Sequence, residues 1–465
     1  MKRVDKNRPN VLLIFTDQQR FDTIGALGNP AIKTPNLDRF VKNGCSFTSA
    51  YTPSPVCVPA RCSTHYGQYP HNTGCFSNKD SMPEDGRESF VDALTKSGYR
   101  THGIGKCHFT PDIHALRGFQ TREYQEHPHP DSERDDYCRF LKDNGYGDTL
   151  NQVDYDGMRG PTGHLREIPQ LSHLPEQLHP TQWTGDRSIA FLEKAVKDNQ
   201  PWFLFSSFIH PHPPLALPPA WAFLYDWAQM PVPIYPESKT KCLQKFLKAY
   251  KSGSLKKKES WYFDEEYNLI LKQYLRAFYY AAITFIDFQI GRITSVLEKY
   301  NQLDKTLIIF TSDHGEYLGD HCRFGKLRFH DSSARIPLIM RYPDSFPAGE
   351  ICSKPVSLVD IAPTVLSFAG AKIKSHVLDG ENLAEIAAGT INRDMVFSQI
   401  FNPSRYMAVN RQWKYTYSPI DNNEELLFDR ENDPEEIQNK AGQQDYLQIQ
   451  KDLRLSLIKQ LNIPI

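Results

Sequence analysis

The sequence lacks the features that direct a chain to nucleic acid or into a membrane. Its 54 lysines and arginines nearly balance 55 aspartates and glutamates, so the net charge of −1 offers no basic excess for either partner. No apolar run approaches the length of a transmembrane helix. Residues 1–9 are charged and contain no apolar core of signal-peptide length. We therefore expect a cytoplasmic protein from the chain as written, or a periplasmic or secreted one if a leader was removed.

Patterned cysteines and internal repeats are also missing. Nine cysteines are scattered over 465 residues without the spacing of a metal site. Their odd number fits a reducing compartment better than a disulfide framework. We find no repeated segment, and nothing in the sequence predicts an oligomeric state. The length is ample for a large core and exceeds that of a single small domain.

What the sequence does contain is a series of short apolar runs that alternate with amphipathic segments. Residues 10–16, 202–209 and 306–311 are nearly continuous apolar runs, as expected of strands buried on both faces of a parallel sheet. After about Gly380 the pattern changes: residues 406–417 alternate between apolar and polar, and residues 425–429 form a short segment, which together predict an antiparallel sheet. We predict an α/β fold in which a large, mostly parallel sheet flanked by helices forms a catalytic domain over residues 1–375. A smaller C-terminal α+β subdomain with an antiparallel sheet would follow over residues 376–465.

Three segments carry weaker patterns. Residues 45–51 are predicted as one short strand, and residues 239–260 as a basic, solvated insertion. Residues 111–180 show little periodicity, which indicates loops and short helices of the kind that recognise substrates. Aromatic and histidine side chains of such loops could line a sugar-sized pocket, although most are expected to be packing or surface residues: Tyr124, His127, His129, Tyr137, His164, His173, Trp183, Trp221 and Trp227.

The segment 55–67 has the spacing of an anion-binding helix. Pro59 suits the first turn and Gly67 the end of a short helix, which would place Cys57 at the helix entrance. Free N–H groups and the positive end of the dipole favour anions there. Arg61 lies on the same face, four residues on. A nucleophile, a guanidinium and a helix N-terminus would together suit a tetrahedral oxyanion, whereas the alternative is a buried, inert cysteine.

Ionisable residues follow four of the predicted strands, namely Asp17, Lys106, His212 and Asp313. Ligands of α/β sheets bind beyond the carboxyl ends of the strands, so we expect these side chains to converge. Either aspartate alone could be a helix cap. Together with Gln18 they supply oxygen ligands suited to a hard divalent cation such as Ca²⁺.

The segment Cys57-Val58-Pro59-Ala60-Arg61 resembles the Cys-x-Pro-Ser/Ala-Arg signature of type I sulfatases, formylglycine-dependent enzymes of the alkaline phosphatase superfamily. Gly105-Lys106-Cys107-His108 is similar to the family's Gly-Lys-x-His segment, and residues 210–214 contain its His-x-Pro histidine. Asp313-His314-Gly315 and the later Lys326 complete the order. The resemblance extends from Asn10 to about Lys440 and implies the alkaline-phosphatase-like fold.

The resemblance implies hydrolysis of a sulfate ester by covalent catalysis. A maturation enzyme would oxidise Cys57 to formylglycine, whose hydrate attacks the sulfur and later releases sulfate. The catalytic residues would then be Cys57, Arg61, Lys106, His108, His212 and Lys326. Arg61 and the two lysines would neutralise sulfate oxygens, His212 or Lys326 would protonate the leaving oxygen, and His108 would act as the base. Asn78 and His210 would contact the substrate.

The resemblance also implies a metal held by Asp17, Gln18, Asp313, His314 and position 57. Many members have a second aspartate where this chain has Gln18, so one negative charge is missing. We expect Ca²⁺, with Mn²⁺ or Mg²⁺ as alternatives, since the imidazole of His314 also suits transition metals.

Two other functions remain open. A phosphonate monoester or phosphodiester hydrolase of the same superfamily would share Asp17-Gln18, Asp313-His314 and Asn78, but the basic pair Lys106 and His108 favours a sulfatase. A sugar-binding relative without the aldehyde is disfavoured because a competent residue fills every catalytic position. The predicted substrate is a sulfated carbohydrate, with choline sulfate or an aryl sulfate as alternatives. The sequence does not distinguish exo from endo action.

Overall fold

The computed structural model describes residues 8–126, 133–147, 169–235, 265–343, 345–401, 405–461 and 463. The predicted insertion 239–260 and the loop histidines His127, His129 and His164 lie outside these residues. Across the described ranges, no helix combines the length and the apolar character needed to cross a membrane.

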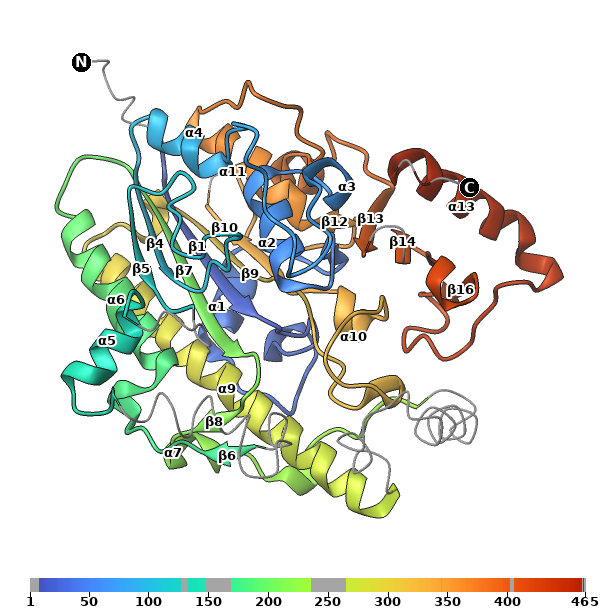
Figure 1. Cartoon of the computed structure of the whole chain (residues 1–465), viewed down its shortest axis with the longest axis horizontal. Helices are drawn as coiled ribbons and strands as arrows, with labels where there is room; N and C mark the ends of the chain where they lie inside the picture. Colours follow the sequence, from blue (N-terminus) through green and yellow to red (C-terminus); the bar gives the residue numbers. More distant parts are fainter. Residues whose placement is uncertain are drawn as a thin grey trace.

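An eight-stranded sheet lies at the centre of the molecule, with its strands in the order β11-β2-β10-β9-β1-β7-β4-β5 (Figure 1). The block from β9 to β5 is parallel throughout. The predicted large, mostly parallel sheet is therefore confirmed. The strands are β1 (Asn10–Asp17), β2 (Cys45–Phe47), β3 (Ala50–Tyr51), β4 (Arg100–Gly105), β5 (Thr121–Tyr124), β6 (Gln170–Leu171), β7 (Trp202–Pro211), β8 (Ala216–Leu217), β9 (Thr306–Ser312), β10 (Leu338–Arg341), β11 (Glu350–Cys352), β12 (Val356–Ser357), β13 (Met395–Ile400), β14 (Arg405–Asn410), β15 (Trp413–Ser418) and β16 (Glu424–Asp429).

Helices cover both faces of this sheet, with α2, α4 and α11 on one side and α1, α6 and α9 on the other (Figure 1). The helices are α1 (Pro35–Asn43), α2 (Cys57–Tyr66), α3 (Pro70–Thr73), α4 (Phe90–Lys96), α5 (Asp136–Asp143), α6 (Pro180–Ala195), α7 (Pro219–Ala222), α9 (Glu265–Lys299), α10 (Asp331–Ala334), α11 (Ile361–Ala369), α12 (Leu383–Ala387) and α13 (Leu447–Leu461).

The central strand β1 shows why its sequence is apolar throughout. Side chains alternate between the two faces of a strand. Val11, Leu13 and Phe15 therefore join the core under α2, α4 and α11, while Leu12 and Ile14 join the core under α1, α6 and α9. Because both faces are covered, the whole run must be apolar until Asp17, where the strand leaves the core.

The structure departs from the expected pattern at three places. Strand β10 runs antiparallel to both of its neighbours, β9 and β2. Residues 45–51 are not one strand but two, because β2 pairs in the large sheet whereas β3 pairs with β12 in a separate sheet. The weakly patterned segment 111–180 contributes β5 to the edge of the large sheet. Each of these strands is only two to four residues long, too short to show a clear sequence period.

The C-terminal part carries the antiparallel sheet that the alternating pattern predicts. Its strands lie in the order β13-β14-β15-β16, and α13 packs on β14 and β15. This part, drawn in red, lies to one side of the large sheet in Figure 1. Residues 411–412 separate β14 from β15, so the stretch 406–417 is a hairpin. The domain boundary at 375/376 stays a prediction.

A buried charge cluster joins this C-terminal part to the rest of the chain. Lys414, on β15, has no exposed surface, and its Nζ lies 2.5 Å from a carboxylate oxygen of Glu436 and 3.0 Å from the carbonyl of Phe329. The same ammonium forms an ion pair with Asp331, whose other partners include the hydroxyl of Tyr51 at 2.8 Å. Burial and the charge of Asp331 raise the pKa of Glu436 to about 7.

Replacement of the lysine at the centre of this cluster should destabilise the protein strongly. Lys414→Met removes the cation that Asp331 and Glu436 share. Among the described residues, Asp331 then keeps only its ion pair with Arg335. Removal of one partner from a buried ion pair costs about 3–5 kcal/mol. Urea unfolding followed by tryptophan fluorescence measures the loss. Lys451→Met, at an exposed position of α13, is the matched control and should change stability little. Equal unfolding curves for the two variants would show that the cluster is not stabilising.

Candidate active site

The predicted site residues meet where the carboxyl ends of the central strands face the N-terminus of α2. Asp17 is the last residue of β1, Asp313 follows β9 directly, and Cys57 is the first residue of α2. The helix ends as predicted at Gly67, whose φ of 64° is left-handed and whose N–H donates to the carbonyl of Ser63. It is longer than the two turns expected, because it begins before Pro59 and spans ten residues.

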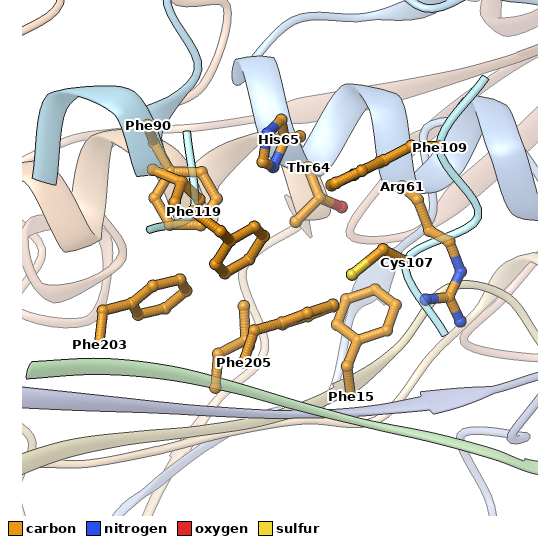
Figure 2. Close-up of a pocket in the computed structure, with 12 residues that line it drawn as sticks. Phe15, Arg61, Thr64, His65, Phe90, Cys107, Phe109, Phe119, Phe203 and Phe205 are labelled. Atoms are coloured by element: carbon orange, nitrogen blue, oxygen red, sulfur yellow. The ribbon is translucent and has the colours of Figure 1, made fainter. Parts of the chain in front are cut away.

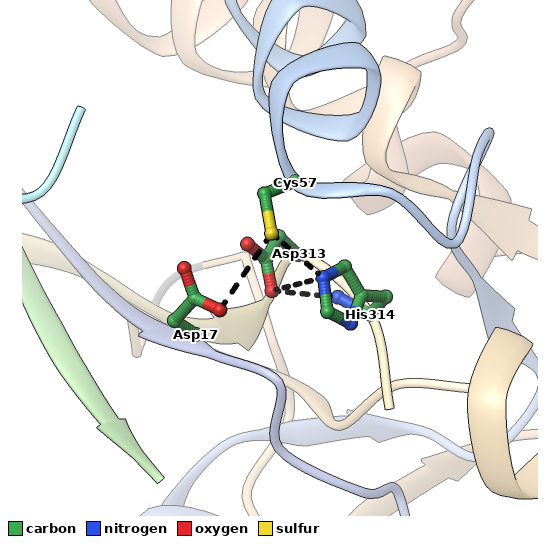
Figure 3. A group of neighbouring side chains, drawn as sticks. All are labelled: Asp17, Cys57, Asp313 and His314. Carbon is green, nitrogen blue, oxygen red and sulfur yellow. Dashed lines mark hydrogen bonds and ion pairs between the residues drawn. The ribbon is translucent and has the colours of Figure 1, made fainter. Parts of the chain in front are cut away.

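Four buried side chains form a group that can hold a metal ion. Figure 3 shows Asp17, Cys57, Asp313 and His314 pointing toward one another, with one ligand atom from each within 4.8 Å of the others. The Sγ of Cys57 lies 3.2 Å from Nε2 of His314 and 3.9 Å from a carboxylate oxygen of Asp17. The chain thus brings together four of the five predicted metal ligands in this group.

The chemistry of this donor set fits a divalent cation. His314 Nδ1 lies 3.0 Å from the carbonyl oxygen of Gly315, so Nδ1 carries the proton and Nε2 is free to bind a metal. Burial and the nearby charge of Asp17 raise the pKa of Asp313. A cation between the two carboxylates would relieve that repulsion, and carboxylate oxygens suit hard divalent ions.

Arg61 connects the two aspartates. Its Nη2 donates to Asp17 and its Nε to Asp313, both at 3.1 Å, while Nη1 donates to the carbonyl of Lys106 at 2.5 Å. The guanidinium also lies 5.0 Å from the ring centroid of Phe15 on β1. Burial opposes its charge, but the two aspartates and Cys57 raise the pKa of Arg61, so it stays a cation.

Two lysines surround position 57. Lys106 forms an ion pair with Asp17 at 2.6 Å, and Lys326 Nζ lies 3.3 Å from the Sγ of Cys57. Burial and Asp17 disfavour a thiolate at Cys57, yet Lys326 and Lys106, with His314, hold the thiol pKa well below its usual range. Burial likewise works against Asp17, whose pKa Lys106 and other cations hold well below its usual range. The site is therefore built to stabilise negative charge at position 57.

Gln18 lies beside this group in an unusual conformation. Its φ of 70° is in the left-handed region, which a non-glycine residue adopts only when its surroundings hold it there. Its side-chain oxygen accepts from Nζ of Lys326 at 2.5 Å, and its amide nitrogen donates to Glu316. Its role as the fifth metal ligand stays a prediction.

Four of the remaining predicted residues form a more open layer, whereas His210 is buried. His108 and His212 are half-buried, as is Lys326, and Asn78 is exposed, whereas the metal group is buried. The Asn78 oxygen accepts the N–H of Val58 at 3.0 Å, in the first turn of α2. A substrate would therefore approach from this open side.

The predicted histidines outside the metal group differ in how their rings are held. His212 Nδ1 lies 2.7 Å from the carbonyl of Pro213, and burial together with Lys326 lowers its pKa well below the usual value. The Nδ1 of His108 is buried without a hydrogen-bond partner among the described residues. His210 bonds to the hydroxyl of Thr181 at 3.0 Å and stacks on His179, and its substrate-contacting role stays a prediction.

Sequence reasoning missed the residues that support this constellation. Ser207 bonds both Arg61 and the carbonyl of Lys106, at 3.1 and 2.6 Å. Glu126 accepts the N–H groups of residues 107 and 108, at 2.7 and 2.9 Å. The hydroxyl of Tyr279, on α9, donates to the carbonyl of Gln18 at 2.5 Å. The one signal that the sequence offered was Ser207, a polar residue within a largely apolar strand.

Those loop aromatics that the structure describes pack in different places. Tyr137 and Trp183 are core residues with their rings in edge contact at 5.6 Å, and Trp221 stacks on Phe285 at 4.3 Å. Trp227 is 38% exposed. Their packing and surface positions agree with the role expected for most of them.

The fold and the site together define a hydrolase of the alkaline phosphatase superfamily. A parallel sheet delivers paired acidic residues to a buried metal group, and cations converge on a nucleophile position at a helix N-terminus.

The chain belongs to the sulfatase family, whose model, described as Sulfatase, matches residues 9–371. A second model, described as N-sulphoglucosamine sulphohydrolase, C-terminal, matches residues 319–462. An arylsulfatase of Clostridium perfringens is 31% identical over 98% of this chain and 94% of its own. An N-acetylglucosamine-6-O-sulfatase of Bacteroides thetaiotaomicron is 26% identical over 97% of this chain and 86% of its own.

A solved structure shares the fold. The phosphonate monoester hydrolase of Agrobacterium radiobacter superposes with a TM-score of 0.81 at 25% identity, covering 98% of this chain and 95% of that one. The alkaline-phosphatase-like fold and the resemblance to type I sulfatases are thus confirmed. The chain is an enzyme of the sulfuric ester hydrolase class, which uses formylglycine and a metal in general.

Next to the site, an apolar pocket between α2 and the sheet holds a buried histidine. Phenylalanine side chains line the pocket, and Arg61 lies at one end of it (Figure 2). His65 is 5% exposed, and its ring centroid lies 5.0 Å from that of Phe109. Its Nε2 donates to the carbonyl of Arg117 at 2.8 Å. Burial lowers the pKa of His65 to about 4.

This histidine should make the protein sensitive to acid. The unfolded chain protonates His65 near pH 6.5 but the folded protein only near pH 4, so stability falls as the pH drops through this window. His65→Gln keeps a donor but does not titrate, and should remove on the order of 3 kcal/mol of the loss. Unfolding free energies at pH 7 and pH 4 measure the difference. His173→Gln, at an exposed position, should keep the wild-type slope, and the same slope in His65→Gln would contradict the assignment.

Proposed function

We propose that this enzyme removes sulfate from a sulfated carbohydrate, with formylglycine made from Cys57 and a bound divalent cation. The observation that carries the proposal is the convergence on position 57 of Lys326, 3.3 Å from Sγ, with Lys106 and Arg61 bound to the neighbouring Asp17. Three cations around a buried nucleophile position at a helix N-terminus suit the oxygens of a sulfuryl group.

Asp17, Gln18, Asp313 and His314 would hold the cation together with position 57. We assign Ca²⁺ first, because most of the ligands are oxygens, with Mn²⁺ and Mg²⁺ as alternatives. The hydrated aldehyde at position 57 would supply the nucleophile, and a cation held there would make that group more acidic.

The other residues bind the sulfate group and move protons. Arg61 and Lys106 are fixed by ion pairs and would donate hydrogen bonds to sulfate oxygens without reorganising. Lys326, at the open side, would donate a proton to the leaving oxygen. The low pKa of His212 keeps its ring neutral, which supports Lys326 over His212 as this donor. We assign the role of the base to His108, whose buried Nδ1 has no partner among the described residues.

The carbohydrate assignment is supported by the names of relatives. The similar Bacteroides enzyme is an N-acetylglucosamine-6-O-sulfatase, and the C-terminal family model is named for an N-sulphoglucosamine sulphohydrolase. Asn78 and His210 are our candidates for contact with the sugar. A formylglycine-generating maturation enzyme would act on this chain. We propose that the sulfatase itself is located in the cytoplasm.

A phosphonate monoester or phosphodiester hydrolase is the second candidate, because the Agrobacterium phosphonate monoester hydrolase shares the fold at a TM-score of 0.81. The ion pair of Lys106 with Asp17 favours the sulfatase, since it adds a positive charge where those relatives are expected to carry a neutral hydroxyl residue. Choline sulfate and aryl sulfate remain the other sulfate esters to compare.

The proposal is tested by measuring sulfate release from sulfated mono- and disaccharides, an aryl sulfate and choline sulfate. These rates are compared with the turnover of an aryl phosphonate. We expect kcat/KM to be highest for a sulfated sugar. Lys106→Met should lower kcat/KM for it by about 100-fold or more, as expected for loss of a group that stabilises transition-state charge. Cys57→Ala, which cannot be oxidised to the aldehyde, is the inactive control. Faster turnover of the phosphonate than of every sulfate ester would overturn the assignment.

A further inference from the structure

Glu316 is a buried carboxylate next to the site with a separate task for each of its oxygens. It lies two residues after His314 and is 3% exposed. Its Oε1 accepts the N–H of Leu318 at 3.1 Å and that of Gly325 at 2.5 Å. Its Oε2 accepts a hydrogen bond from the side-chain amide nitrogen of Gln18. One oxygen thus holds the loop that leads to Lys326, and the other holds the amide.

The amide of Gln18 lies between groups of opposite charge. Its nitrogen donates to Glu316, and its oxygen accepts from the ammonium of Lys326 at 2.5 Å. The two ends of a carboxamide are nearly equal in size but opposite in hydrogen-bonding character. A flipped amide would place its NH₂ group against Lys326 and its oxygen against Glu316. Both contacts would be repulsive, so the two charges select one orientation.

The main chain of Gln18 is held independently. Its N–H donates to Asp313 at 2.9 Å, and its carbonyl accepts the hydroxyl of Tyr279 at 2.5 Å. With the backbone fixed in its left-handed conformation, the side-chain amide group could still rotate. Its hydrogen bond to Glu316 prevents this rotation.

We propose that Glu316 is a positioning residue that, by holding the amide nitrogen of Gln18, keeps the Gln18 oxygen on the side of Lys326 and position 57, where it can serve the cation. A carboxylate at position 18 would offer equivalent oxygens and would need no such partner, whereas an amide binds a cation through one end only. Groups that orient a metal ligand contribute to metal affinity although they do not touch the ion. The inference rests on the cation site of the proposed function but does not depend on the reaction or its substrate.

Cation binding to the metal-free protein tests this role without substrate. Glu316→Gln keeps an oxygen for the N–H groups of Leu318 and Gly325 but places an NH₂ group against the amide nitrogen of Gln18. Calorimetric titration with Ca²⁺, and separately with Mn²⁺, should show a dissociation constant about 10–100-fold higher than that of the wild type. Glu298→Gln, at an exposed position of α9, should bind as the wild type does.

A second background separates orientation from a general loss of structure. In a Gln18→Glu protein, the amide introduced by Glu316→Gln can donate to the new carboxylate, so this change should leave cation binding equal or tighter there. Opposite effects of Glu316→Gln in the two backgrounds support the proposal. Equal weakening in both, or none in the natural Gln18 background, would overturn it. If the single variant does not fold, the comparison in the Gln18→Glu background still tests the proposal. A contrary result in cation binding does not bear on sulfate ester hydrolysis, which is tested by its own assay.

Discussion

The pairing of one buried guanidinium with two buried aspartates holds the active site and the fold in the same arrangement. Arg61 lies on α2, and its side chain binds Asp17 at the end of β1 and Asp313 after β9. A buried charge is costly unless it is paired and hydrogen-bonded, so α2 cannot shift away from the sheet without breaking both ion pairs of the buried Arg61 guanidinium. The sheet therefore orients the helix, and the helix orients position 57.

Much of this could be predicted because it depends on local pattern and on the order of motifs. The apolar runs identified β1, β7 and β9, since burial on both faces leaves a signal in the sequence itself. Motif order identified Asp17, Cys57, Asp313 and His314, which the structure brings within reach of one another. The direction of β10 could not be predicted, because a strand as short as Leu338–Arg341 has the same sequence pattern whether it pairs parallel or antiparallel.

The supporting residues could not be predicted for a different reason. Glu316, Ser207 and Tyr279 are ordinary polar residues whose partners lie far away in the sequence, so no local spacing distinguishes them. Their importance arises from buried donors and acceptors that must be satisfied in the folded chain. The residues that hold charge in the buried layer follow family motifs, as do His108 and His212 of the more open layer, so motif order could find both sets but not the residues that support them.

The cluster around Lys414 has a consequence for how such chains can be recombined. Its lysine comes from the antiparallel sheet, while Asp331 precedes that sheet by some distance and follows soon after Lys326 in the chain. A chimera that takes the C-terminal segment from a relative without a cation at position 414 would leave Asp331 buried against the new segment without that lysine. Exchange of this segment between sulfatases should therefore succeed best where the incoming chain supplies a cation at this position.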